Sequence, residues 1–249
     1  LTKEIKENIQ KISRDLNKKG LRVIAVCKKY NTEKNHKLNV QDEKNMTLLG
    51  FIGFLDPPKE SAKLAIEKLN NAGIRVIVLT GDNAAVTKCI CKKVNINAKK
   101  IVICDKVGIM SENIILGSKL DRLSDMAVHR LIKKNNIFAK LSPIQKARIV
   151  RLLKEDNNIV GYMGDGINDA PSLTNSDVGV SVDTAVDIAK ETADIILLEK
   201  DLNVLLDGVT EGRKTFANLM KYIKLATSFN FGEVLSVIVA SVVLPFLPE

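Results

Sequence analysis

The sequence predicts an α/β fold in which a parallel sheet carries helices on both faces, followed by one long C-terminal helix. From about residue 59 onward, short apolar runs alternate with amphipathic stretches. This is the pattern of buried parallel strands and their covering helices. Glycine and proline stand at the junctions, as Gly73 and Pro143 do. An almost uncharged run ends the chain and indicates a helix of a different kind.

The first part of the chain predicts one helix and two strands. Apolar residues recur from Ile5 to Leu16 at the spacing of one helix face. This spacing predicts a helix over 3–19, which the following glycine ends. The apolar run 21–30 predicts a strand. The run 46–58 predicts another, closed by a Pro-Pro pair that cannot continue a ladder.

The remaining elements alternate between the two patterns. Predicted helices cover about 59–72, 84–94, 120–134, 143–155, Asn168 onward and 184–191, and a long one starts near 202. Predicted strands cover 74–80, 136–141, 158–164, 178–182 and 193–199. In a parallel sheet of this kind, ligands bind beyond the carboxyl ends of the strands. The residues just after each strand are therefore the candidates for function.

Composition limits the classes of partner. The 249 residues carry a net charge of +9, which favours a phosphorylated substrate, a membrane surface or nucleic acid. Aromatic residues are 4% of the chain, too few for base stacking, so we expect no nucleic acid partner. The four cysteines form no C-x-x-C pair, which disfavours zinc. Reduced thiols in a cytosolic environment fit this usage better.

The segment after the predicted strand 74–80 is suited to bind phosphate. Thr80, Gly81 and Asp82 come just past the strand end and open the next helix. A hydroxyl, a flexible glycine and free N–H groups at a helix start form a phosphate-binding arrangement. Taken alone, the segment could equally be an ordinary helix cap.

A second strand end carries two carboxylates. Asp165 follows the strand 158–164, Gly166 permits a sharp turn, and Asp169 then falls in the first turn of the next helix. Two clustered carboxylates suit a hard cation such as Mg²⁺, which keeps waters and bridges to phosphate. A turn and a cap are the alternative for these two residues alone.

A lysine lies between these two motifs in the sequence. Pro143 marks a helix start, and Lys146 lies in the first turn of that helix. A lysine at this place can neutralise a phosphoryl group, although alone it could be a solvated helix charge. The order of the three motifs, each at a strand end, is more specific than any one of them.

These motifs resemble a known family. Thr-Gly-Asp-Asn at 80–83, Ser-Pro-Ile-Gln-Lys at 142–146 and the run from Met163 to Leu173 look like the phosphorylation domain of P-type cation-transporting ATPases, a haloacid-dehalogenase-like, Rossmann-like fold. The segment 53–59 resembles the hinge into that domain, and 20–26 resembles the last strand of the nucleotide-binding domain. The resemblance covers essentially the whole chain. Its C-terminal third is most similar to bacterial magnesium-transporting members.

The resemblance implies roles for the phosphate-binding residues. Thr80, Gly81 and Asp82 would border the transferred phosphate and the incoming ATP, and Lys146 would hold the γ-phosphate. Lys140 stands where the family usually has arginine, six residues before the motif lysine. A lysine keeps the charge but loses the bidentate fork, so we assign Lys140 no firm role.

The resemblance also implies a metal site and a nucleotide contact. Asp165 would bind the catalytic Mg²⁺ with Asp169 in support, and Asn168 would touch phosphate. Arg22 would contact the nucleotide from the neighbouring domain, and Asp56 would position the hinge beside it. Positioning together with cation and lysine electrostatics is what phosphoryl transfer needs.

The family's nucleophile has no counterpart in this sequence. It is the aspartate of an Asp-Lys-Thr-Gly-Thr run, and the one similar run here begins at Asp105. Val107 and Ile109 replace its two threonines, and the run follows Thr80 instead of preceding it. We therefore expect the nucleophile to lie before Leu1, which would make the chain a fragment that is inactive alone.

The C-terminal run predicts a membrane helix. Residues 225–248 contain one charged residue, and at about 1.5 Å per residue they are long enough to cross a bilayer core. Basic residues precede this run, which places residues 1 to about 224 on the cytoplasmic side of the membrane. By resemblance, this region would be the stalk and the fifth membrane helix. A buried C-terminal hairpin is the alternative.

Two polar residues in this run are candidates to bind the transported ion. Asn230 and Glu233 lie on one helix face, and a carboxylate in lipid is usually functional, although Glu233 could also lie near the interface. The segment resembles the ion-binding segment of calcium-type pumps, whereas magnesium-type members generally have asparagine at the position of Glu233. Oxygen ligands suit Mg²⁺ or Ca²⁺. We expect Mg²⁺, with Ca²⁺ as the alternative.

Three regions follow from these expectations: 1–52 as the end of a nucleotide-binding domain, 53–204 as the phosphorylation domain, and 205–249 as stalk and membrane helix. We expect an ATP-driven pump part that forms an aspartyl phosphate and transports a divalent cation. Its partners would be ATP, Mg²⁺, the lipid bilayer and the N-terminal remainder of the pump. A soluble phosphatase using Asp105 and a non-catalytic module that holds Mg²⁺ or nucleotide stay open as alternatives.

Overall fold

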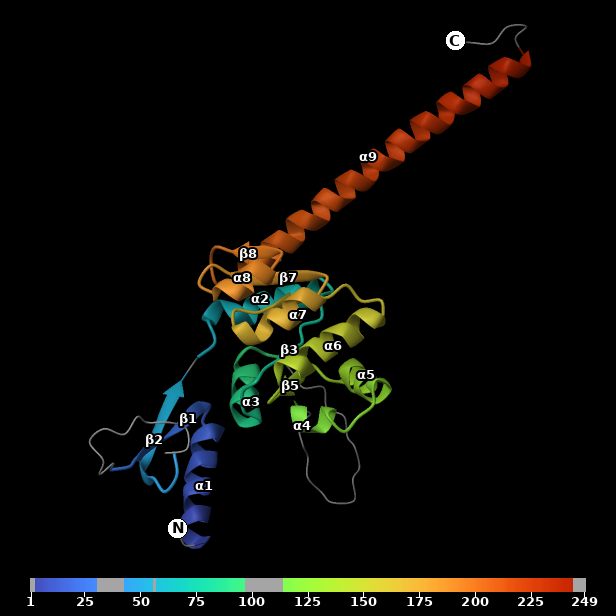
Figure 1. The fold of residues 1–249 in the computed structure, drawn as a ribbon. Coiled ribbons are helices and arrows are strands. Elements are labelled where there is room, and N and C mark those ends of the chain that lie inside the picture. Colours follow the sequence, from blue (N-terminus) through green and yellow to red (C-terminus); the bar gives the residue numbers. More distant parts are fainter. Residues whose placement is uncertain (1–2, 31–42, 56, 97–113, 244–249) are drawn as a thin grey trace, which may run out of the picture. The chain divides into compact units, whose positions relative to one another are not determined.

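The computed structural model describes residues 3–30, 43–55, 57–96 and 114–243 (Figure 1). Its helices are α1 (Lys3–Lys18), α2 (Glu60–Asn71), α3 (Ala84–Lys93), α4 (Gly117–Leu120), α5 (Asp125–Lys134), α6 (Pro143–Glu155), the 3₁₀ turn η2 (Ile167–Asp169), α7 (Ala170–Asn175), α8 (Asp187–Thr192) and α9 (Leu202–Val243). Its strands are β1 (Leu21–Lys28), β2 (Thr47–Leu55), β3 (Val78–Leu79), β4 (Ile115–Leu116), β5 (Ile137–Ala139), β6 (Gly161–Met163), β7 (Val178–Val182) and β8 (Ile195–Leu197).

The chain divides into two compact units, Leu1–Leu202 and Asn203–Glu249. The second unit consists of nearly all of α9, in which no described residue is buried. By its length and composition, α9 is long and apolar enough to cross a membrane. Its 42 residues correspond to a length of about 63 Å, roughly twice the hydrocarbon core of a bilayer.

The N-terminal elements form a small antiparallel unit. β1 and β2 pair from Leu21 opposite Leu55 to Lys28 opposite Thr47. The turn between α1 and β1 needs glycine, because Gly20 has a φ of +85° and a Cβ there would lie 2.8 Å from the Cys89 sulfur on α3. This close approach joins the turn to α3 within the first unit.

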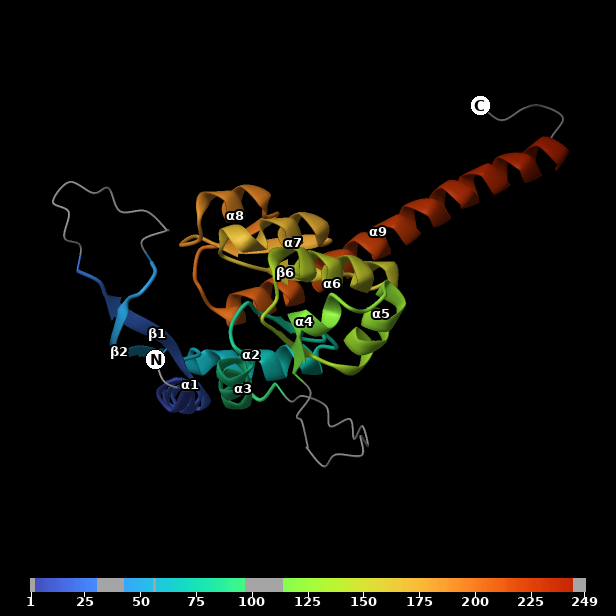
Figure 2. The same ribbon diagram turned by 60° about the horizontal axis from the view of Figure 1, so that its bottom comes forward.

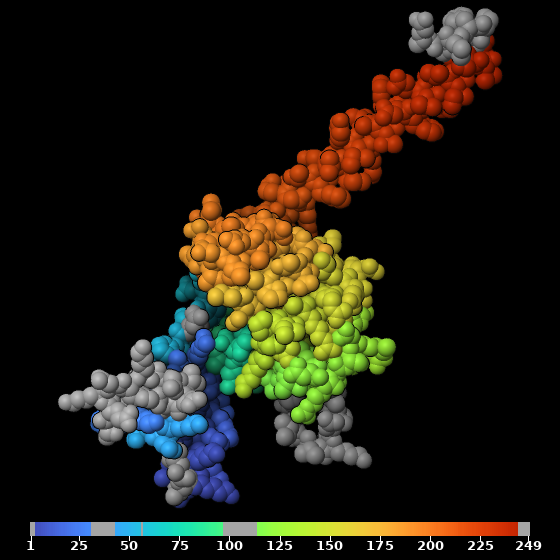
Figure 3. Space-filling view, in the orientation of Figure 1, coloured from blue at the N-terminus to red at the C-terminus, as the bar shows by residue number. Residues whose placement is uncertain are grey.

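Six short strands form two parallel three-stranded sheets, ordered β3-β5-β4 and β6-β7-β8. The sequence predicted one parallel sheet, whereas the described residues form two separate three-stranded parallel ladders. Among the described residues, the four end strands β3, β4, β6 and β8 each pair on one side only. Helices α6, α7 and α8 lie side by side (Figure 2). The segments from α5 to β8 make one continuous packed body (Figure 3).

The core lies between the β3-β5-β4 sheet and its helices. Its buried residues are apolar and come from β4, α4, α5, β5, the turn after β5, and α6: Ile115, Leu120, Val128, Ile132, Phe138, Leu141, Ile149 and Leu152. Phe138 and Ile149 are fully buried. Because α6 packs on this core, the position of its first turn is set by apolar burial.

Two predicted elements differ in extent from the observed ones. The run 74–80 forms a ladder only at Val78–Leu79, because strand pairing requires a partner and β5 supplies only Ile137 and Phe138 opposite it. The predicted helix 120–134 is broken into α4 and α5, since Ser124 has an extended backbone (φ −64°, ψ 159°). The predictions that fall on Asp56 and Asp105 lie outside the described residues.

Candidate functional site

The loop after β3 is bound through its backbone to the end of β5. The Leu141 N–H donates to the Thr80 carbonyl, and the Lys140 N–H donates to the Asp82 carbonyl, each at 3.0 Å. The Thr80 hydroxyl accepts from the Asp82 N–H at 3.1 Å. The helix cap itself is the next residue, Asn83, whose side chain accepts from the second residue of α3. Thr80, Gly81 and Asp82 therefore lie beside the segment that leads into α6.

The first turn of α6 is held by a buried glutamine. Ser142 and Gln145 form a capping box, in which each side chain bonds the other residue's N–H. The Gln145 amide also donates to the Gly117 carbonyl at 3.1 Å and to the Asp121 carboxylate at 2.5 Å. A Cβ on Gly117 would lie 2.4 Å from the Gln145 oxygen, so glycine is required there. This network orients the turn that carries Lys146.

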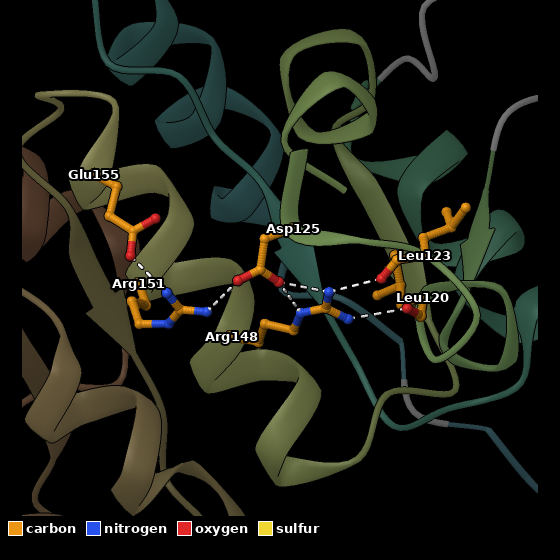
Figure 4. Close-up of polar contacts among 6 residues, drawn as sticks. All are labelled: Leu120, Leu123, Asp125, Arg148, Arg151 and Glu155. Atoms are coloured by element: carbon orange, nitrogen blue, oxygen red, sulfur yellow. Dashed lines mark hydrogen bonds and ion pairs between the residues drawn. The ribbon is translucent and has the colours of Figure 1, made fainter. Parts of the chain in front are cut away.

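Arginines bind the rest of α6 to the segment between α4 and α5 (Figure 4). Arg148 donates to the carbonyls of Leu120 and Leu123, at 2.9 and 2.8 Å. It also shares the Asp125 carboxylate with Arg151. Hydrogen bonds from Arg151 and then Arg148 hold the pKa of Asp125 below its ordinary value. The helix break before α5 thus leaves carbonyls that Arg148 satisfies.

Lys146 and Asp169 form a buried ion pair that joins α6 to η2. The Lys146 ammonium lies 2.8 Å from Asp169 Oδ1, and the two side chains are 12% and 14% exposed. The Tyr162 hydroxyl donates to the same oxygen at 2.7 Å. The Gly166 N–H donates to Oδ2 at 3.3 Å. A Cβ on Gly164 would lie 2.4 Å from the Asp169 Cβ, so glycine permits the close approach.

Burial and hydrogen bonds act in opposite directions on this cluster. Burial raises the pKa of Asp169, but hydrogen bonds from Lys146 and Tyr162 outweigh it, and the net pKa lies below its ordinary value. Burial, then the hydrogen bond to the Asp169 carboxylate, raises the pKa of Tyr162. Asp169 is therefore a carboxylate and Tyr162 a neutral hydroxyl donor at neutral pH.

Asp165 forms a different kind of pair. Its Oδ2 lies 2.7 Å from the ammonium of Lys200, in the segment between β8 and α9, and the side chains are 54% and 55% exposed. The Asp165 carbonyl accepts from the Val186 N–H at 3.2 Å, which fixes the backbone of the loop. Asn168, three residues further along the chain, is exposed. In the part of the chain that the structure describes, Lys200 is the side chain that bonds this carboxylate.

The two carboxylates fit Mg²⁺ unequally. No group of three His, Cys, Asp or Glu that could hold a metal occurs among the described residues. A Mg²⁺ here would therefore need water or phosphate oxygens as well, which is its usual preference. Asp165 is exposed and bonded by one side chain, so it fits as a ligand. Both oxygens of Asp169 already accept hydrogen bonds, so it fits better as the anchor of Lys146.

A pocket brings Arg22 of β1 and Asp82 together. Its volume is about 380 Å³. Its remaining lining is mainly apolar: Gly20, Ile24, Phe54, Val86 and Ile90. A cationic side chain beside a largely apolar wall suits a ligand with a ring and an anionic or hydroxylated part. The other candidates, Asn230 and Glu233, are exposed on α9.

Sequence patterns missed three residues of the site. Lys200 follows the carboxyl end of β8, and the strand-end rule could have identified it. The Ser-x-x-Gln spacing of a capping box at 142–145 could have identified Gln145. Tyr162 gave no comparable signal, because it lies inside an apolar strand run.

Comparisons with known proteins agree with the motifs. A family described as haloacid dehalogenase-like hydrolase matches residues 1–177. The magnesium-transporting ATPase, P-type 1, of Escherichia coli K12 is 49% identical over 96% of this chain and 25% of its own length. The counterpart in Salmonella typhimurium is 48% identical over the same shares. A calcium-transporting ATPase of Bacillus cereus is 34% identical, over 96% of this chain and 26% of its length.

A solved structure has the same fold. The crystal structure of a zinc-transporting PIB-type ATPase in the E2.Pi state matches with a TM-score of 0.61 at 22% identity, over 94% of this chain and 30% of that one. The chain thus spans about a quarter of the length of the magnesium-transporting relatives it matches. The predicted resemblance to P-type ATPases and the predicted fold class are confirmed.

Proposed function

Since the chain belongs to the haloacid dehalogenase-like hydrolase family, we propose that it is the phosphoryl-transfer and coupling part of an ATP-driven P-type cation pump. The ion pair between Lys146, which follows β5, and Asp169, in the loop after β6 that also carries Asp165, supports this most directly. One ammonium and two carboxylates beyond the carboxyl ends of strands suit the binding of a phosphoryl group together with a hard cation.

In this proposal the described residues position and neutralise the transferred group. Lys146, oriented by Gln145 and held by Asp169, stabilises the γ-phosphate. Thr80, Gly81 and Asp82 border the phosphate, and Asn168 contacts it from the other loop. Bound Mg²⁺ would neutralise charge on the phosphate oxygens, with Asp165 as its protein ligand. Such positioning and electrostatic stabilisation is the main protein contribution to phosphoryl transfer.

The nucleotide and the nucleophile complete the site. We assign the pocket lined by Arg22 and Asp82 to ATP. Asp56, which lies outside the described residues, would position the hinge. β3 and β6 each keep one unpaired edge among the described residues. A parallel strand pairing there would end at the same sheet edge as Lys146 and Asp165. We propose that such a strand, carrying the nucleophilic aspartate, comes from the remainder of the pump.

We propose the same three regions that the sequence predicted. Residues 1–52 end the nucleotide-binding domain, 53–204 form the phosphorylation domain, and 205–249 form the stalk and membrane helix. The absence of buried residues in the described part of α9 suits lipid contact along its apolar part. Residues up to about 224 would be cytoplasmic, since basic side chains precede the apolar run.

The transported cation in this proposal is Mg²⁺. The higher identity to magnesium-transporting relatives than to a calcium-transporting one, 49% against 34%, supports this choice. Asn230 and Glu233 would supply oxygen ligands from α9. The carboxylate of Glu233 favours Ca²⁺ as the second candidate, because Ca²⁺ takes more oxygen ligands than Mg²⁺.

The test is phosphoenzyme formation from ATP in the full-length protein. Asp165→Asn should lower labelling by about a hundredfold or more, since a charge that stabilises the transferred group is lost. Asp187→Asn is the matched control, because Asp187 is 95% exposed and pairs only loosely with Lys190 at 3.7 Å. Normal labelling of Asp165→Asn would refute the assignment. For the transported ion, Glu233→Ala should change the cation dependence, and an unchanged dependence would refute that role.

A further inference from the structure

Lys200 approaches Asp165 from a segment whose backbone is held in place. The Lys200 carbonyl accepts a hydrogen bond from the Lys59 ammonium, just ahead of α2. The Asp201 carboxylate accepts from the Ser61 hydroxyl at 3.1 Å. These contacts fix residues 200–201 at the start of α2, while the Lys200 side chain extends to Asp165. The backbone that carries the Lys200 ammonium is therefore held in place by hydrogen bonds to the residues around the start of α2.

The Lys200–Asp165 bond has the features of an exchangeable contact. It is a single bond of 2.7 Å between side chains that are more than half exposed. Water can replace either partner with little desolvation penalty, so the pair is weakly bound. The pair of Lys146 and Asp169 differs, because it is buried and a tyrosine hydroxyl and a backbone N–H reinforce it.

We propose that Lys200 is a displaceable counter-cation of Asp165, which holds the carboxylate until Mg²⁺ replaces it. The proposal rests on the proposed function, in which Asp165 binds the divalent cation. Mg²⁺ binds carboxylate oxygens at about 2.0–2.1 Å. An ammonium 2.7 Å from the same carboxylate would lie close enough to repel the metal. Each cation therefore disfavours the other at Asp165.

The exchange has a consequence for the chain beyond the site. Lys200 lies two residues before the first residue of α9. Cation binding at Asp165 therefore frees an ammonium at the covalent entry to the long apolar helix. Lys200 is a positioning residue in this scheme, and its release signals cation binding at Asp165 to the segment that precedes α9.

The test is a Mg²⁺ titration of this 249-residue chain in detergent micelles at constant ionic strength, measured by isothermal titration calorimetry, a readout that the Asp165→Asn variant retains. Lys200→Met should bind Mg²⁺ roughly two- to fivefold more tightly than the parent, the range expected for losing an exposed competing pair. Lys200→Arg should restore the parent affinity. Lys154→Met is the control, since Lys154 also forms a lysine–aspartate pair, with Asp177 at 3.0 Å, although that pair is less exposed at 37% and 34%, and its Mg²⁺ affinity should equal the parent's.

The outcomes separate this proposal from the proposed function. Equal Mg²⁺ affinity in Lys200→Met and the parent would overturn the exchange, while loss of the titration in Asp165→Asn would still support a metal at Asp165. A titration that survives Asp165→Asn would remove the metal from Asp165 and overturn both. The absence of any Mg²⁺ response in Lys200→Met would also overturn the exchange, because removing a competitor should expose the site.

Discussion

Two lysine–aspartate pairs bind the two carboxylates of the loop after β6. Their N–O distances are nearly equal, but their solvent exposure and their additional hydrogen-bond partners differ. Lys146–Asp169 and Lys200–Asp165 measure 2.8 and 2.7 Å. The first pair is 12% and 14% exposed and has two further donors, whereas the second is 55% and 54% exposed and has none among the described residues. Bond length alone therefore does not rank these contacts, and burial and additional partners do.

The difference follows from how solvent acts on charges. A buried charge that loses its partner cannot be rehydrated, so breaking such a pair is costly. An exposed charge recovers its hydration, so an exposed pair contributes little. We infer that the buried pair holds the lysine that neutralises phosphate in a fixed position, whereas the exposed pair can exchange its partner.

Asp169→Asn should have the largest effect on stability. It leaves the Lys146 ammonium, 12% exposed, without a counter-charge, and we expect the free energy of unfolding to fall by about 3 kcal/mol. Urea unfolding of the chain in detergent, followed by circular dichroism, measures this. Asp165→Asn is the matched control and should cost less than about 1 kcal/mol. Equal losses in the two variants would contradict the distinction between the pairs.

The acid dependence of this loss sharpens the comparison. Because the pKa of Asp169 is lowered in the folded state, its carboxylate stabilises the fold fully above the unfolded-state pKa, about 3.9. This contribution is lost as pH falls through the folded-state pKa. The stability difference between the parent and Asp169→Asn should thus be constant above about pH 5 and shrink below about pH 4. A difference that persists undiminished at lower pH would show that it has another cause.

Tyr162→Phe should have an intermediate effect. It removes the hydroxyl that donates to Asp169 at 2.7 Å but keeps the buried ring. Hydrogen bonds to charged groups contribute about 1.5–3 kcal/mol, and we expect the lower end because Lys146 still bonds the same oxygen. Unfolding free energies of Tyr162→Phe and the exposed control Tyr30→Phe measure this. A loss no larger than the control's would mean that the hydroxyl does not support the buried pair.

The sequence predicted which segments meet at this edge. Carboxyl ends of parallel strands share one edge of a sheet, so the residues after β3 and β6 were expected there, and Lys146 was expected in the first turn of α6. The structure brings Lys146 to Asp169 and binds the Thr80 loop to the end of β5. Hydrophobic periodicity and strand order are local properties, which explains why these predictions were possible.

The choice of partners could not be predicted in the same way. The sequence suggested that Asp165 and Asp169 act together on one cation, whereas each accepts a different lysine. Lys200 reaches Asp165 across 35 residues of chain, and Tyr162 reaches Asp169 only because Gly164 allows close approach. Such pairings depend on side-chain directions set by the packed fold, which no spacing rule encodes.

Lys200→Met should have the smallest effect on stability and thereby provides the sharpest contrast. Because the pair with Asp165 is more than half exposed, we expect the free energy of unfolding to change by less than about 0.5 kcal/mol. The small difference should decrease further as salt rises and screens the charges. Unfolding curves of Lys200→Met and Lys154→Met at low and high salt measure this. A loss as large as that of Asp169→Asn would make the exposed pair a structural element, and a contact that stabilises the fold so strongly could not serve as an exchangeable one.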